Sequence, residues 1–177
     1  MSERPLPAVA TAIIKLINRE PHIVVTARVP HADYSYSYPG GAVEPGEPPD
    51  RAASREILEE TGLHIPPRKL TPVPGLDPVP DRGRTFTLRL FYHFLSPGSP
   101  VRPKNTLPQL HRGWQWAPLE GLIAAEICGH IPSAALPIAL LEIIRSQTRA
   151  VTGRPSRSAY YHPRETPAAV TLPDWPY

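Results

Sequence analysis

The stretch GGAVEPGEPPDRAASREILEETGLHI, residues 40–65, decides how the rest of this chain is interpreted. Prolines at positions 48 and 49 suit the first turn of a helix, where a missing N–H costs least. Gly62 suits the left-handed residue that ends a helix. The stretch therefore predicts a helix over residues 48–61. Spacings of three and four residues share one helix face, so three carboxylates are predicted to lie together: Glu56, Glu59 and Glu60.

Three like charges so close oppose helix formation unless something offsets them. Carboxylate oxygens suit hard divalent cations such as Mg²⁺ and Mn²⁺. The alternative is a solvated acidic face, which is the commoner meaning of a bare ExxEE pattern. The context favours the cation, because a Gly-rich turn and Glu47 precede the predicted helix and Arg55 lies directly before Glu56.

The spacing of these residues resembles the Nudix box. Gly41, five residues, Glu47, seven residues and then REILEETGL at 55–63 fill every fixed position of that pattern. The resemblance implies an α/β fold, an α/β/α sandwich with a mixed sheet in which the box forms a strand, a loop and a helix. It also implies a Mg²⁺-dependent hydrolase, with Mn²⁺ as the other candidate ion, that cleaves a nucleoside diphosphate linked to another group.

The resemblance assigns roles within the box. The principal metal ligands are Glu59, Glu60 and the Gly41 carbonyl, and Glu56 is a further ligand or the general base. Arg55 and Glu47 form an ion pair that orients the cluster, and Glu47 is also a candidate metal ligand through water. The catalytic set is therefore expected to be Glu56, Arg55 and Glu59.

Some relatives take their general base from a glutamate outside the box. Acids are scarce between residues 65 and 119, where only Asp77 and Asp81 occur. Glu120 and Glu126 are therefore the late-chain alternatives, and the scarcity favours Glu56.

Residues outside the box are candidates for substrate binding: Arg28, Tyr36, Arg89, Trp116 and Glu126. Arg28 ends a predicted strand, where relatives often place a basic residue near phosphate, and Tyr36 stands before Pro-Gly-Gly, where they often have an aromatic one. Each candidate on a predicted strand has a structural alternative. Arg28 could be a solvent-exposed strand end, Arg89 a salt-bridge partner, and both aromatic residues core or sheet cover.

The remaining elements follow from alternation, periodicity and turn residues. The sequence predicts an antiparallel hairpin over 8–28, one short edge strand within 65–80, a strand over 85–95, a polar loop over 96–112, a strand over 113–118 and a helix over 133–147. The helix is apolar nearly all round, so it is expected to be buried.

Composition sets the outer limits. The chain has 177 residues, 41% of them hydrophobic, which suits one ordinary domain. We expect a Nudix domain over 1–147 and a Pro-rich tail, extended or flexible, over 148–177. A net charge of +3 is too small to predict a nucleic-acid surface, and no apolar run approaches a membrane span. A cytoplasmic protein acting on a small nucleotide is expected, with homodimerisation left open.

Three functions are weighed. The first is a Nudix hydrolase. Its expected substrate is a nucleoside triphosphate or modified nucleotide, and the alternative substrate is a nucleotide sugar of the ADP-ribose type. The second function is a Nudix-like domain that senses a nucleotide without hydrolysis, which the intact box disfavours. The third is a relative of the isoprenoid isomerases, which the placement of the lone Cys128 disfavours; one cysteine also excludes an intrachain disulfide.

Overall fold

The computed structural model describes residues 6–28, 36–73, 79–81, 84–96, 99–109, 111–122, 143 and 146. Its elements, in chain order, are β1 (Leu6–Ile17), β2 (Glu20–Arg28), β3 (Tyr36–Ser37), β4 (Gly40–Ala42), α1 (Pro49–Thr61), the 3-10 turn η1 (Pro67–Lys69), β5 (Thr71–Pro72), β6 (Val79–Asp81), β7 (Arg84–Phe94) and β8 (His111–Pro118). Among the helices in this part of the chain, none is long and apolar enough to cross a membrane. Glu126 and the expected tail over 148–177 lie outside the described residues.

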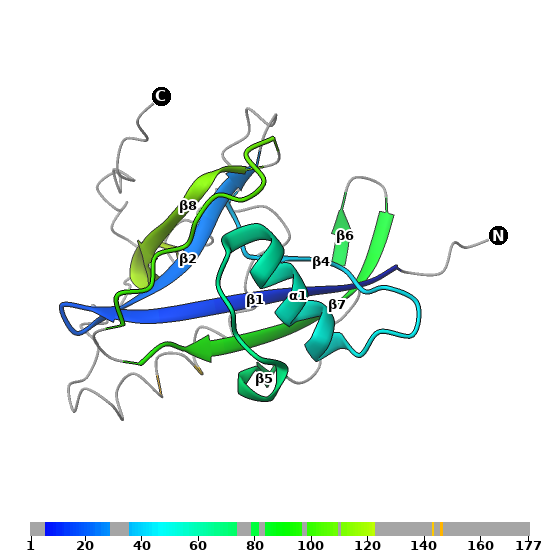
Figure 1. Ribbon diagram of the computed structural model, residues 1–177, viewed down its shortest axis with the longest axis horizontal. Helices are drawn as coiled ribbons and strands as arrows, with labels where there is room; N and C mark the ends of the chain where they lie inside the picture. The colour runs from blue at the N-terminus through cyan, green and yellow to red at the C-terminus, as the bar shows by residue number, and fades with distance from the viewer. Residues whose placement is uncertain are drawn as a thin grey trace, which may run out of the picture.

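One mixed sheet carries the fold, with α1 lying across it (Figure 1). The strand order is β3-β2-β1-β7-β5; β1 and β7 run parallel, and the other pairs run antiparallel. The predicted β1–β2 hairpin is confirmed, and its turn consists of Asn18 and Arg19 alone, both with positive φ. The predicted edge strand is also confirmed, because β5 pairs only with the outer side of β7.

The sheet divides along β1. One edge of β1 pairs with β7 through residues 6–14. The other edge is shared, with residues 14–17 paired to β2 and residues 8–10 paired to β4. Because β2 and β4 pair with different parts of the same edge of β1, β4 lies beside β1 and leads directly into the loop before α1. The box therefore begins where this edge of β1 changes partner.

Each face of the sheet packs a separate core. The core on the helix side combines strand residues with the buried side of α1: Val9, Ile13, Val24, Phe91, Ala52, Ala53 and Ile57. The opposite core takes the alternate strand residues, as period-two geometry requires: Ala12, Ile14, Ile23, Val25, Leu90 and Tyr92. Ile143, whose backbone is helical, packs on this second core. The predicted α/β architecture with a mixed sheet is confirmed. Of the helix expected over 133–147, the structure describes only Ile143 and Ser146, and both are helical.

The prediction for residues 111 and 112 was wrong. The sequence placed them in a polar loop, but β8 begins at His111, which pairs with Arg28 of β2. The His111 side chain is 2% exposed. The sequence around His111 is polar and did not predict a strand. The buried position is occupied by His111 itself, which bonds to the buried Glu60.

Candidate active site

Helix α1, which carries the glutamates, begins and ends at the residues that the sequence predicts. Pro48 is the N-cap with extended backbone, Pro49 opens the helix, and Asp50 places a negative charge in the first turn. Gly62 ends the helix with φ 68°, and its N–H donates to the Leu58 carbonyl. The predicted helix over 48–61 is therefore confirmed, with its first helical residue at Pro49. The buried Ile57 fixes which side of α1 faces the sheet.

Glu60 is buried, with 5% of the residue exposed. Its two carboxylate oxygens accept from two different elements: Oε2 from the Gly40 N–H at 2.9 Å, and Oε1 from His111 Nε2 at 3.0 Å. A buried carboxylate is costly unless hydrogen bonds satisfy it. These two contacts therefore fix the Glu60 carboxylate between β4 and β8.

Glu56 lies against the Gly41 backbone. A Cβ atom at Gly41 would meet the Glu56 carboxylate at 2.5–2.8 Å, so only glycine leaves room for this arrangement. Only 14% of the Glu56 side chain is exposed. Burial raises the pKa of Glu56, Arg55 opposes that shift, and the negative charges of Glu60 and Glu59 add to it.

Arg55 connects the acidic groups. Its guanidinium donates through Nε and Nη2 to Glu47, through Nη1 to both Glu56 and Glu59, and through Nη2 to the Ala42 carbonyl, at 2.9–3.2 Å. The hydrogen bond from Arg55 lowers the pKa of Glu47, and the bonds to Glu47 and then Glu56 raise the pKa of Arg55. The expected ion pair between Arg55 and Glu47 is present. Arg55 also binds the carboxylates of Glu56 and Glu59.

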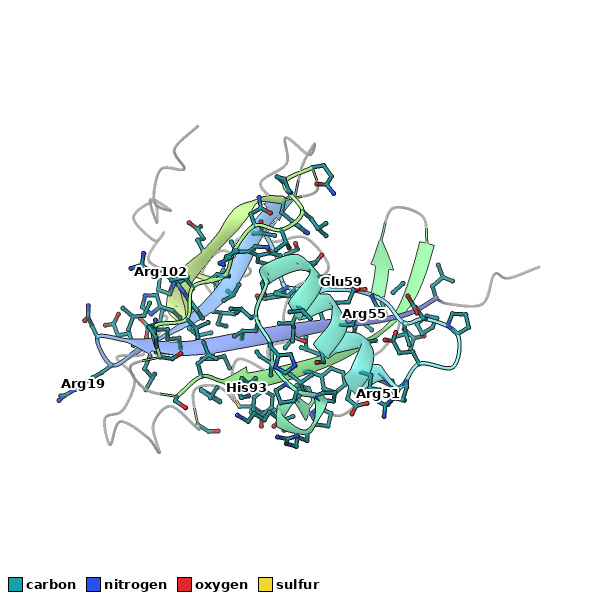
Figure 2. The ribbon with its side chains drawn as sticks, in the orientation of Figure 1. Arg19, Arg51, Arg55, Glu59, His93 and Arg102 are labelled. Carbon is teal, nitrogen blue, oxygen red and sulfur yellow. The ribbon has the colours of Figure 1, made fainter. Side chains whose placement is uncertain are left out.

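Glu59 is the most exposed of the three, with 52% of its side chain accessible. Figure 2 shows Arg51, Arg55 and Glu59 following one another along α1. Shared contact with Arg55 Nη1 brings the Glu59 and Glu56 carboxylates together, while Glu60 turns inward. The three carboxylates thus share a helix face but have different surroundings.

A family model described as the NUDIX domain matches residues 6–134, which is more than half of the chain. The chain belongs to the Nudix family. Among curated proteins, the NAD-capped RNA hydrolase NudC of Salmonella paratyphi B is 36% identical over 63 residues. That alignment covers 36% of this chain and only 24% of the relative, so the match spans about a quarter of the length of the curated relatives.

Solved Nudix structures share the fold at low identity. The Nudix domain of Shewanella oneidensis NrtR, complexed with ADP ribose, has a TM-score of 0.63 at 15% identity, covering 82% of this chain and 90% of that one. A Caenorhabditis elegans Ap4A hydrolase has a TM-score of 0.59 at 18% identity, covering 84% and 99%. A MutT Nudix hydrolase from Burkholderia pseudomallei has a TM-score of 0.55 at 24% identity, covering 67% and 86%.

The donor chemistry of the Nudix box fits a hard divalent cation. Within the described residues no three His, Cys, Asp or Glu side chains form a complete metal site. The donors are nevertheless adjacent, because Glu56 lies on the Gly41 backbone and shares Arg55 with Glu59. Glu60 uses one acceptor position on each oxygen, and a carboxylate has further lone pairs.

Among the candidates for substrate binding, the structure describes the side chains of Arg89 and Trp116. Arg89 is exposed on β7. Trp116 is partly buried and packs against the helix-side core, with Lys15 Nζ 5.6 Å from its ring centre. Arg28 ends β2 and Tyr36 begins β3, where only their backbone is described, and Glu126 lies outside the described residues. Glu120, an alternative base, is exposed just after β8.

His111 is the residue that the sequence prediction missed. Its ring contacts Glu60, although Trp114 and Trp116, which also pack on the helix side, have the opposite parity in the strand. Two features break the period-two rule between them: Gly113 has φ 132°, and the pairing with β2 shifts register between Thr26 and Arg28. Alternation alone would have placed His111 on the wrong face.

Proposed function

We propose that this Nudix protein is a hydrolase that cleaves a phosphoanhydride bond in a nucleoside diphosphate linked to another group. One observation carries the proposal: the Glu56 carboxylate lies directly against Gly41, in contact with Arg55 and mostly shielded from water. A shielded carboxylate against a glycine backbone suits a hard cation and a phosphate substrate. A solvated acidic face would have left Glu56 exposed.

The proposal gives each group of the box a role. The residues that would hold Mg²⁺, or Mn²⁺, are the Gly41 carbonyl, Glu56, Glu59 and Glu60, with Glu47 acting through water. A divalent cation there would neutralise the phosphate oxygens and make a water easier to deprotonate. Arg55 orients Glu56 and Glu59 because one nitrogen binds both.

Glu56 is the proposed general base, with metal coordination as its alternative role. Its position against Gly41 places it beside the proposed ligands. Burial also raises its pKa, which moves a carboxyl closer to the range where it accepts a proton efficiently. Glu120, by contrast, is exposed at the end of β8.

The proposed substrate is a nucleoside triphosphate or a modified nucleotide, and a nucleotide sugar of the ADP-ribose type is the alternative. The relatives support the wider class: their names give Ap4A, ADP ribose and NAD-capped RNA, and each of these contains adenosine attached to a phosphate chain. Arg28, Tyr36, Arg89, Trp116 and Glu126 stay as proposals for substrate contacts. The protein is proposed to be cytoplasmic and to act without a nucleic-acid or membrane partner; homodimerisation stays open.

The test is a product assay on the full chain with Mg²⁺. The panel contains nucleoside triphosphates, oxidised nucleotides, ADP-ribose, diadenosine tetraphosphate, NAD and NAD-capped RNA, with release of phosphate, pyrophosphate and nucleoside monophosphate followed by chromatography. We expect turnover of at least one nucleotide class, lost on chelation and reduced about 10²–10⁴-fold in Glu56→Gln. Glu20→Gln, at the exposed start of β2, is the matched control. Nucleotide binding without product would favour the sensing function instead.

A further inference from the structure

The segment over residues 104–114 holds the end of the helix that carries the glutamates. The last four carbonyls of a helix have no partner within the helix itself. In α1 the first of them is met by Gly62, and the rest by this segment: Thr106 Oγ1 donates to Glu59 O, Trp114 Nε1 to Glu60 O at 2.8 Å, and the Lys104 N–H to Thr61 O at 2.8 Å. The last turn of α1 is therefore fixed by residues 43–54 positions later in the chain.

His111 adds a side-chain contact to these backbone contacts, because its ring bonds to the Glu60 carboxylate. It lies between the Glu60 carboxylate, 3.0 Å from its Nε2, and the Trp114 ring, 5.0 Å away between ring centres. Asn105 Nδ2 donates to the His111 carbonyl at 2.8 Å, and the His111 N–H donates to Leu107 O at 3.1 Å. Both backbone polar groups of this residue are thus bonded, and its ring is held in place.

The hydrogen bonds also specify the tautomer. A carboxylate oxygen can only accept, so the proton must lie on Nε2 of His111. Nδ1 is buried and has no hydrogen-bond partner among the described residues. The contact with Glu60 is therefore a directed N–H···O bond from Nε2.

We propose that His111 is a positioning residue for the Nudix glutamates, acting through Glu60. With Oε1 on His111 and Oε2 on Gly40, the carboxylate cannot rotate, and its remaining lone pairs keep a constant direction. This inference rests on the proposed function, because it assigns Glu60 as a ligand for the divalent cation. Groups that orient a metal ligand typically change metal affinity or activity about 10–100-fold when they are removed.

The experiment compares four proteins: wild type, His111→Gln, His111→Leu and His93→Leu. Glutamine retains an N–H near the position of Nε2, while leucine fills space without a donor. His93 is the matched control, since it is a part-buried strand histidine whose ring bonds to a backbone carbonyl, that of Lys69. Each protein is measured by Mn²⁺ titration with electron paramagnetic resonance, by thermal unfolding, and by kcat and KM on the substrate found in the panel.

We expect His111→Leu to weaken Mn²⁺ binding and lower kcat about 10–100-fold, with KM for the nucleotide changed less, and His111→Gln to restore most of both. His93→Leu should lower the unfolding temperature and leave Mn²⁺ affinity and kcat as in wild type. Equal Mn²⁺ affinity in wild type and His111→Leu would overturn the inference, and so would equal losses in the Gln and Leu variants. If His111→Leu does not fold, His111→Asn replaces it, because its shorter amide cannot reach Glu60.

The two failures are distinguishable. A wild-type protein that binds Mn²⁺ but releases no product would contradict the proposed hydrolysis and leave the affinity comparison valid. An active wild type whose His111 variants keep full Mn²⁺ affinity and kcat would contradict only the role of His111.

Discussion

The carboxylate of Glu56 lies against Gly41, where burial raises its pKa. Glu60, one helical turn further on, is also buried but accepts from a backbone N–H and a histidine. Glu59 faces solvent beside Arg55. The spacing of three and four residues predicts that these groups share a side of the helix. It does not predict their different burial, because that depends on contacts outside the helix, with Gly41 for Glu56 and with Gly40 and His111 for Glu60.

Replacing Glu56 with glutamine should lower activity about 10²–10⁴-fold but stabilise the fold at neutral pH. A carboxyl whose pKa is raised on folding contributes stability below its unfolded pKa, and that contribution is lost as the pH rises through the folded pKa. At neutral pH the ionised Glu56 therefore opposes folding, and glutamine removes that effect. Thermal unfolding of both proteins at pH 4 and pH 7.5, in chelator, measures this. We expect a higher Tm for Glu56→Gln at pH 7.5 and a smaller gain at pH 4. A lower Tm at pH 7.5 would show that the bond to Arg55 outweighs burial.

At the scale of elements, the box works as a unit of β4, a loop and α1, and the sequence predicts it well because its signals are local. The prolines start the helix and Gly62 ends it. The attachment of α1 to residues 104–114 was not predictable in the same way. Thr106, His111 and Trp114 bond to groups far away in sequence, and Gly113 changes the parity between them.

Two adjacent glycines of β4 should respond differently to alanine. A Cβ at Gly40 would lie 2.2 Å from the Val9 carbonyl oxygen and 2.7 Å from the Ala10 Cα, both backbone atoms that cannot move aside. Gly40→Ala should therefore separate β4 from β1 and destabilise the protein by at least about 1–3 kcal/mol. At Gly41 the added Cβ meets only the Glu56 side chain, which can move.

Gly41→Ala should accordingly keep most of the stability and lose about 10²-fold in kcat, because the added Cβ displaces Glu56 from its place against the Gly41 backbone. Chemical denaturation and steady-state kinetics on both variants make the comparison. Similar stability losses in the two variants, or full activity in Gly41→Ala, would be inconsistent with this geometry.

At the scale of the whole molecule, one sheet separates two cores. Strand β4 pairs with β1 at one edge of the divide and leads into the box. The apolar, β-branched composition of β1 and β2 and the alternation in β7 are local properties, so the sequence predicts these strands, although the central residues of β1 and β2 are buried on both faces of the sheet. The split of β1 between β2 and β4 requires pairing over long distances, and no local pattern reports it. The buried side of α1 then determines which carboxylates remain accessible.

A chain ending at residue 147 should keep both its fold and its activity. The Nudix match ends at residue 134. The composition after 147 is rich in proline and arginine and has few large aliphatic residues, which is typical of a segment that does not form a core of its own. Tm and kcat of the shortened protein, measured beside those of the full chain, should agree. A large loss of either would mean that residues 148–177 pack on the domain.

The central claim is that the glutamates of α1 bind a divalent cation beside Gly41. Mn²⁺ added in small steps to ¹⁵N-labelled protein tests it directly, because the ion broadens amide signals according to distance. The account predicts that the first signals lost are those of Gly40, Gly41 and residues 56–60, while the signal of Arg19, which Figure 2 shows far from α1, stays sharp. Broadening that begins elsewhere, or that is uniform along the chain, would contradict it.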